Sequence, residues 1–380
     1  MLNNLFKYTY GTLHILSTFI LPILIVLVGL KGNISLVADI TILQSILFMF
    51  FFPLNGNARN YLLNSVDKNL VKNILNLKSL IFVPLFFITY ISASFVLEIN
   101  STSLLLLILV GSISWFLEIF ITEAEKNKKY KVIILLILLN IIGIIYLIFS
   151  ELTFKNLNYF CIYFILFNSP IILLKFYQNL FNINFKNLKN VFFTKILNQI
   201  GGTTIIGLSS FILKYSLLLI LPKTIAGTLF LSFTIGASLC TAITYSLMPS
   251  VIFNNLIQMK KSMIIFFLLF CLAGIIVIFI KTLQIEIIEF NQDLFLISLL
   301  FSLAGSFINI FSQYYKFLVS SIITDLNLSL YEMIINGCTI IIVVLLIIFI
   351  NEYGAVLTYI LSGLISLYFY KKLFIELQKE

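Results

Sequence analysis

The chain has 380 residues, of which 61% are hydrophobic and only 10% are charged, and its mean hydropathy is +1.12. Soluble domains carry about 25% charged residues, so this composition excludes a water-soluble globule and makes the lipid bilayer the main solvent. The formal net charge is +9, but the lysines fall between apolar runs rather than along one stripe. This distribution indicates membrane orientation and argues against nucleic-acid binding.

Metal and cofactor chemistry has little support in the sequence. There is one histidine, His14, and each of the four cysteines sits inside an apolar run (Cys161, Cys240, Cys271 and Cys338). No CxxC or HxxxH pair occurs, so the spacing supplies neither a closed zinc site nor a histidine-rich site. We therefore expect no metal, no cofactor and no catalytic residue.

Apolar runs long enough to cross a bilayer recur along the whole chain. A spanning helix needs about 20 apolar residues, and this criterion predicts about twelve spans. They lie near residues 10–30, 35–54, 79–97, 103–122, 132–149, 158–174, 195–221, 225–250, 263–280, 293–312, 327–350 and 353–370. Gaps such as 31–34, 98–102 and 222–224 fit only tight turns, which makes neighbouring helices antiparallel. The sequence thus predicts an all-α polytopic membrane protein.

Basic residues predict the orientation of these spans. With a cytoplasmic N-terminus, all but five of the 24 lysine and arginine residues lie on the cytoplasmic side. The five exceptions are Lys31, Lys155, Lys214, Lys223 and Lys281. This asymmetry is the positive-inside pattern for an even number of spans with both termini in the cytoplasm.

A polar connection at residues 175–189 divides the chain into two lobes with six predicted spans each, residues 1–180 and 181–380. Both lobes begin and end inside, so they would be parallel repeats about an axis along the membrane normal. The second span of each lobe has a proline at its inner end, Pro53 and Pro249, with asparagines after it. Proline is also a common helix stop, so this match supports a repeat without proving it.

Ionisable groups inside spans are functional candidates, because each costs about 2.5 kcal/mol or more at the bilayer centre. Lys214 lies roughly 10 Å below the outer end of its predicted helix, too deep to reach the interface fully. Lys195 either reaches the inner interface or, with Gln199, contacts substrate. Arg59 is the single arginine, and its planar fork suits a phosphate or carboxylate. Glu118 lies near an inner helix end, where it can reach the interface or bond to a neighbouring helix.

The arrangement resembles the polysaccharide flippase family of the multidrug/oligosaccharidyl-lipid/polysaccharide (MOP) exporter superfamily. The resemblance rests on the six-plus-six spans, the short outer loops, the mid-chain linker, the second span ending in 56–59, and the stretch 209–236 with Gly227 and Phe230. It implies two six-helix lobes around a central cleft that opens alternately inward and outward. The family usually has an acidic residue in its seventh span, where this chain has Ser216 beside Lys214.

The resemblance also suggests a gate. In that fold the second and seventh spans face each other across the cleft, and Asp39 and Lys214 both lie in the outer parts of those spans. A salt bridge between them would close the outer side, since pairing relieves two costly charges at once. The alternative is that Asp39 only caps its helix and Lys214 points toward the interface.

The sequence as a whole favours a flippase that moves a polyprenyl-diphosphate-linked oligosaccharide across the bacterial inner membrane. Its cleft would offer Arg59, Lys195 and Lys214 to the diphosphate and the Gln199 amide to the sugars. We expect a monomer in contact with membrane lipids, working near polysaccharide polymerase machinery. Two alternatives remain: a multidrug or organic-cation antiporter of the same fold, and a membrane-embedded polysaccharide polymerase or acyltransferase.

Overall fold

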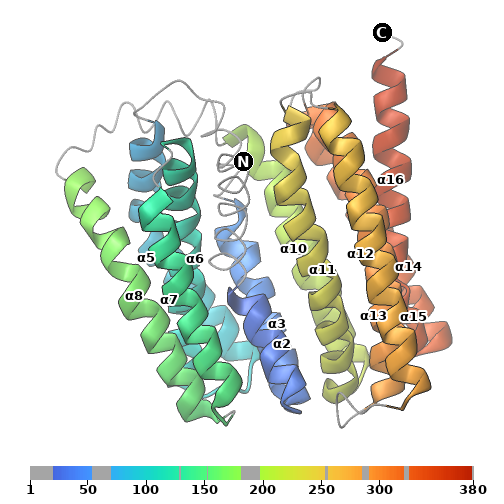
Figure 1. Cartoon of the computed structure of the whole chain (residues 1–380), viewed down its shortest axis with the longest axis horizontal. Coiled ribbons are helices and arrows are strands. Elements are labelled where there is room, and N and C mark those ends of the chain that lie inside the picture. Colours follow the sequence, from blue (N-terminus) through green and yellow to red (C-terminus); the bar gives the residue numbers. More distant parts are fainter. Residues whose placement is uncertain are drawn as a thin grey trace. The chain divides into compact units, whose positions relative to one another are not determined.

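The structure is a computed structural model that describes residues 20–53, 70–127, 130–151, 153–180, 197–252, 256–284, 291–320 and 325–378. Within these ranges the chain forms long helices and no strand (Figure 1). In chain order they are α2 (Ile20–Leu30), α3 (Ile34–Phe51), α5 (Leu70–Val96), α6 (Ser101–Lys126), α7 (Tyr130–Phe149), α8 (Phe154–Leu180), α10 (Leu197–Ile220), α11 (Lys223–Ile252), α12 (Leu256–Thr282), α13 (Gln292–Ser320), α14 (Asp325–Ile350), α15 (Glu352–Val356) and α16 (Thr358–Leu377).

Within the described residues each predicted span overlaps one or two of these helices, which confirms the all-α class, while residues 10–19 of the first predicted span lie outside the described residues. In the described part of the chain, 7 helices are long and apolar enough to cross a membrane. Three shorter apolar helical stretches are Ile20–Leu30, Ile134–Phe149 and Phe270–Thr282. The last predicted span is interrupted at Leu357, between α15 and α16.

The tight turns between helices have the local chemistry that they require. Gly32 has φ 84°, a left-handed conformation that glycine adopts without steric cost. Asn33 caps α3 by accepting a hydrogen bond from the Leu36 amide at 3.2 Å, and Asn100 caps α6 through the Ser103 amide at 2.7 Å. These caps explain why the chain reverses within a few residues and continues as the next helix.

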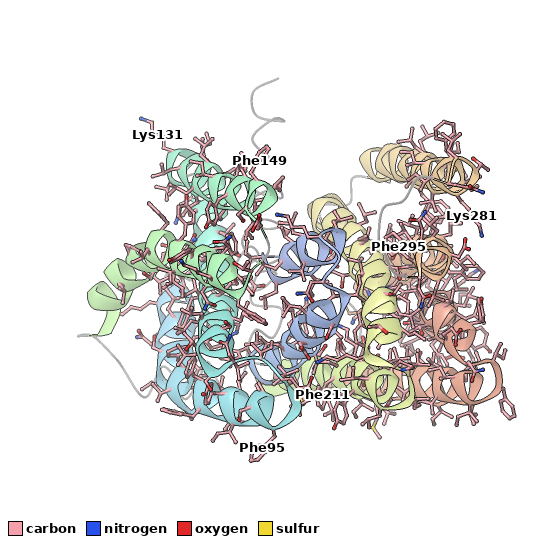
Figure 2. All side chains as sticks on the ribbon, turned by 90° about the horizontal axis from the view of Figure 1, so that it is seen from below. Phe95, Lys131, Phe149, Phe211, Lys281 and Phe295 are labelled. Atoms are coloured by element: carbon pink, nitrogen blue, oxygen red, sulfur yellow. The ribbon has the colours of Figure 1, made fainter. Side chains whose placement is uncertain are left out.

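Large apolar side chains cover the outward faces of several helices. Phe95 on α5 and Phe149 on α7 are each 85% exposed and project from their helices (Figure 2). Isoleucine and leucine side chains on α7, α12 and α14 are exposed in the same way. A water-facing surface would not carry so many contiguous apolar groups, so these faces contact lipid.

The residue contacts divide the chain into two compact units. The first comprises Met1–Ile23 and Ile42–Leu208, and the second comprises Leu24–Thr41 and Ser209–Glu380. Helices α3 and α10 therefore each contribute to both units. The predicted boundary between residues 180 and 181 falls at the edge of 181–196, outside the described residues, and stays a prediction.

The first unit packs around an aromatic cluster and close helix contacts. Trp115 on α6 lies edge-on to Phe51 of α3 at 5.0 Å between ring centroids. Gly207 on α10 comes so near α3 that a Cβ there would lie 2.9 Å from the Phe48 carbonyl oxygen. Thr203 adds a hydrogen bond from its hydroxyl to the Pro53 carbonyl at 3.2 Å.

The second unit is built on α13, which packs against α11 and α16 through small residues. Ser232 and Ser298 share a hydrogen bond of 2.5 Å between α11 and α13. Gly305 and Gly363 let the backbones of α13 and α16 approach, and a Cβ on Gly363 would lie 2.9 Å from the Gly305 carbonyl oxygen. Small residues at helix seams are typical of membrane bundles, where close backbone contact replaces the hydrophobic effect between helices.

Candidate functional site

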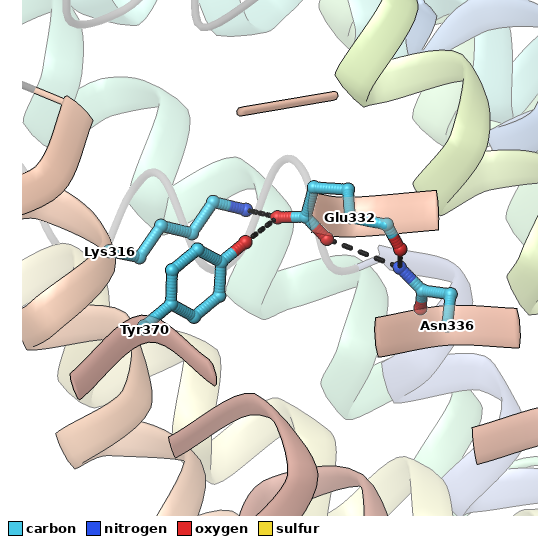
Figure 3. A network of polar contacts seen from close by, with 4 residues as sticks. All are labelled: Lys316, Glu332, Asn336 and Tyr370. Carbon is cyan, nitrogen blue, oxygen red and sulfur yellow. Dashed lines mark hydrogen bonds and ion pairs between the residues drawn. The ribbon is translucent and has the colours of Figure 1, made fainter. Parts of the chain in front are cut away.

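A network of polar side chains joins three helices of the second unit. Lys316 comes from α13, Glu332 and Asn336 come from α14, and Tyr370 comes from α16 (Figure 3). Both the Lys316 ammonium and the Tyr370 hydroxyl donate to Oε1 of Glu332. Asn336 donates from Nδ2 to Oε2 of Glu332 at 3.1 Å and to its backbone carbonyl at 2.7 Å. The carboxylate is therefore held at both oxygens.

Burial makes this network electrostatically important. The side chain of Glu332 is 7% exposed, whereas that of Lys316 is 18% exposed. Tyr370 is almost fully buried, and the Lys316 ammonium lies 5.8 Å from the centre of its ring. A charge in such surroundings is stable only when it is paired and hydrogen-bonded, and Glu332 has both kinds of partner.

Sequence reasoning missed this site. The signal was present, because Glu332 is an acid within the predicted span 327–350 and Lys316 follows the span 293–312 closely. Tyr370, the third partner, gives no signal by itself, since tyrosine is common at membrane interfaces. An acid inside a predicted span, together with a lysine just after the preceding span, is the sequence pattern that would have predicted this ion pair.

Lys214 lies on the face of α10 that packs against other parts of the protein. Leu217 and Leu221, three and seven residues further on, share its helical face and are buried, with 0% and 7% exposure. Ile212 and Leu219, on the other side of the helix, are exposed. Among the residues that the structure describes, no carboxylate pairs with Lys214, which leaves a half-buried cation on a protein-facing stripe.

Asp39 forms an ion pair with Lys223 rather than with Lys214 in this structure. Nζ of Lys223, the first residue of α11, lies 2.9 Å from Oδ1 of Asp39 on α3, within the second unit. The two side chains are 28% and 10% exposed, respectively. The predicted Asp39–Lys214 gate concerns a change between states and stays a prediction, but Asp39 has a partner that the sequence did not suggest.

The first unit contains another buried lysine. Lys78 on α5 is 1% exposed, donates to the Trp115 carbonyl at 2.7 Å, and lies 4.3 Å from the centre of the Trp115 ring. Glu118, one turn further along α6, is close enough to interact electrostatically with it. Glu118 thus lies beside a basic side chain, as Asp39 and Glu332 do.

Three further predicted site residues are Arg59, Lys195 and Gln199. Arg59 and Lys195 lie outside the described residues, and Gln199 lies on α10 without a described side chain. No group of three or more histidine, cysteine, aspartate or glutamate residues suited to a metal ion occurs in the described part.

Two buried amides illustrate the other role that polar side chains play in this bundle. Asn168 on α8 donates to Oδ1 of Asn140 on α7 at 3.2 Å and to the Phe164 carbonyl at 2.9 Å. Both asparagines are nearly inaccessible. This pair connects two helices, which is the structural role open to intramembrane amides.

Comparisons with known proteins place the fold. No family model matches the sequence, and no curated protein matches it. Solved structures do match over nearly the full chain. An inward-facing multidrug-resistance MATE-family transporter of the MOP superfamily has a TM-score of 0.63 at 10% identity, covering 97% of this chain and 96% of that one.

Two further structures agree. A eukaryotic MATE transporter has a TM-score of 0.61 at 13% identity, with 100% of this chain and 98% of that chain covered. A MOP-superfamily transporter from Pyrococcus furiosus, described by a reversed polarity of its binding pocket that suggests a different function, has a TM-score of 0.59 at 10% identity, with 98% and 96% covered. The chain therefore has the fold of the MATE transporters of the MOP superfamily.

Proposed function

We propose that this protein is a flippase that moves a polyprenyl-diphosphate-linked oligosaccharide across the bacterial inner membrane by alternating access. The observation that carries the proposal is Lys214, a cation on a protein-facing stripe of a membrane span with no carboxylate partner among the described residues. An uncompensated charge at this depth is costly and calls for a ligand of opposite sign. A diphosphate supplies that sign.

The distribution of acids supports an anionic cargo over a cationic one. The three buried acids of the described part, Asp39, Glu118 and Glu332, each lie beside a lysine. A carboxylate that is already compensated has little attraction left for an organic cation. The Pyrococcus furiosus transporter with this fold is described by a reversed polarity of its binding pocket that suggests a different function, and we propose that the pocket charge of this chain is likewise suited to an anion.

The second candidate function is a multidrug or organic-cation antiporter. The multidrug-resistance transporter with the same fold favours it. It requires an acid that becomes free to bind a cation during the cycle, and Glu332 or Asp39 would have to leave its lysine to do so. The enzyme alternative has weaker support, because the structural neighbours are transporters.

Replacing Lys214 by glutamine is expected to reduce flipping at least tenfold, while Lys214→Arg retains part of the activity because the charge is kept. A tenfold loss corresponds to about 1.4 kcal/mol, a modest value for a charge-assisted contact to phosphate. The measurement is transbilayer movement of a fluorescent polyprenyl diphosphate in proteoliposomes. Uptake of ethidium, a cationic substrate, is measured in parallel to test the antiporter alternative.

Lys281→Gln is the matched control, because the Lys281 side chain is 49% exposed and forms only a surface pair with Asp293 at 3.5 Å. It should flip the lipid normally. Full activity of Lys214→Gln would contradict the proposed role of Lys214, and ethidium uptake without lipid flipping would favour the antiporter.

Both termini and residues 175–189 are expected to face the cytoplasm, because all but five of the 24 basic residues then lie on that side. The measurement is labelling of single cysteines introduced into a protein that lacks its four native cysteines. A cysteine at Asn184 should react with a membrane-impermeant maleimide only after the inner face is exposed. Reaction from the outer face of intact cells would refute this orientation and the two-lobe division based on it.

A further inference from the structure

We propose that Lys316 and Glu332 form a proton-linked anion site: a phosphate or diphosphate group binds Lys316 in place of Glu332, and Glu332 takes up a proton in exchange. This inference rests on the proposed function, because it names where the same cargo binds on the inner side and which ion accompanies it. The network of Lys316, Glu332, Asn336 and Tyr370 carries the argument (Figure 3).

The groups that face Glu332 define its two states. Helix α13 contributes the Lys316 ammonium, α16 contributes the Tyr370 hydroxyl, and Asn336 comes from its own helix. Lys316 is the one cation bonded to the carboxylate in the described part, so it balances the negative charge. Tyr370 and Asn336 are neutral donors that can bond to a carboxylate or to a protonated carboxyl group.

Lys316 is the member of the pair that a ligand reaches first. Its side chain is 18% exposed, whereas that of Glu332 is 7% exposed. A phosphate carries more negative charge and more acceptor oxygens than a carboxylate, so it competes well for the ammonium. By the positive-inside pattern Lys316 lies on the cytoplasmic side, where a lipid-linked sugar is loaded.

Displacement leaves Glu332 as a carboxylate without a counter-ion in apolar surroundings, a state that costs several kcal/mol. Protonation removes this cost. The proton comes from cytoplasmic water and takes the position on Oε1 that the Lys316 ammonium leaves, while the Asn336 amide continues to donate to Oε2. The site then holds Lys316 with its anion and a neutral Glu332, and the reverse exchange releases the proton when the anion departs.

The linkage has a definite sign. Because the anion-bound state holds one more proton than the free state, binding tightens as the pH falls. Glu332→Gln mimics the neutral carboxyl group, so this variant should bind the anion without taking up that proton. Tyr370→Phe removes a donor but leaves the Glu332 carboxylate in place, so it should keep the proton uptake.

The test is titration calorimetry of the protein in nanodiscs with farnesyl diphosphate, inorganic diphosphate or phosphatidylglycerol as the probe. Each titration is repeated in two buffers of different ionisation enthalpy, which gives the number of protons taken up per ligand bound. The wild-type protein should take up about one proton more per diphosphate than Glu332→Gln does at the same pH. Lys316→Gln should bind each phosphate probe at least tenfold more weakly than the wild type.

The outcomes separate this site from the transport function. Equal proton uptake by the wild-type and Glu332→Gln proteins overturns the inference, and so does the failure of all three probes to bind. Linked uptake with inorganic diphosphate but no flipping of the polyprenyl lipid supports the site and contradicts the flippase function. Linked uptake with phosphatidylglycerol alone identifies a membrane lipid as the anion and supports the site.

A measurement on the unmodified protein covers the case in which Glu332→Gln does not fold. Infrared difference spectroscopy detects the C=O stretch of a protonated carboxyl group, which a carboxylate lacks. Addition of farnesyl diphosphate to the wild-type protein should produce this band, and Tyr370→Phe should shift it by removing a hydrogen bond. Absence of the band at saturating ligand would overturn the inference.

Discussion

Replacing Gly305 by alanine is expected to destabilise the second unit severely. The added Cβ would lie 2.3 Å from the backbone carbonyl carbon of Tyr359 and 2.5 Å from the backbone nitrogen of Ile360. These are main-chain atoms at the start of α16, so no side-chain rotation relieves the clash, and α13 and α16 must separate. We expect a loss of about 3 kcal/mol or more, at the upper end of the range for overpacked cores.

The measurement is the thermal midpoint of the detergent-solubilised protein, followed by fluorescence-detected size-exclusion chromatography. Gly274→Ala and Gly337→Ala are matched controls, because a Cβ at either position meets no atom within 4 Å. Each should be neutral or stabilise its helix by about 0.5–1 kcal/mol, since glycine is a poor helix former. If the thermal midpoint of Gly305→Ala equals that of these controls, α13 and α16 are not packed as described.

The helices were predictable because their signal is local and strong. A span needs about 20 apolar residues, and the polar gaps between such runs in this chain leave few alternatives. The turns followed as well, because the gaps at 31–34 and 98–102 are too short for anything else. The structure adds the roles of Gly32, Asn33 and Asn100, which supply the left-handed residue and the caps at these reversals. Asp39 and Lys214 lie on α3 and α10, the helices that correspond to the second and seventh predicted spans.

The contacts between helices were not predictable in the same way. Hydropathy gives the depth of a residue in the membrane but not the direction in which it points around its helix axis. Lys214 and Lys223 were both expected near the outer side, and depth alone did not identify Lys223 as the partner of Asp39. The Glu332 network had the same difficulty, because its three helices meet only after folding.

Separating Asp39 from Lys223 is expected to have the second large effect, at the contact between α3 and α11. Lys223 is the first residue of α11, where the helix dipole disfavours a cation, and Asp39 is 10% exposed in its side chain. The Asp39 carboxylate therefore offsets the unfavourable position of Lys223 at the helix N-terminus, and the Lys223 ammonium offsets the cost of burying the Asp39 charge. Because the pair is partly solvated, we expect a coupling of about 1–3 kcal/mol, between the values for surface and buried pairs.

A double-mutant cycle with Asp39→Asn and Lys223→Gln measures this coupling as a change in thermal stability, and a second cycle pairs Asp39→Asn with Lys214→Gln. Coupling to Lys223 alone would identify this pair as the contact that holds α3 against α11, whereas coupling to Lys214 alone would support the gate expected from the sequence. The surface pair Lys281–Asp293, with side chains 49% and 82% exposed, is the control. It should couple by less than about 1 kcal/mol. If Asp39 contacts one of these lysines, either single mutation already breaks that contact, so the double mutant should lose less stability than the sum of the two single losses. Additive losses in both Asp39 cycles would therefore show that Asp39 acts without either lysine.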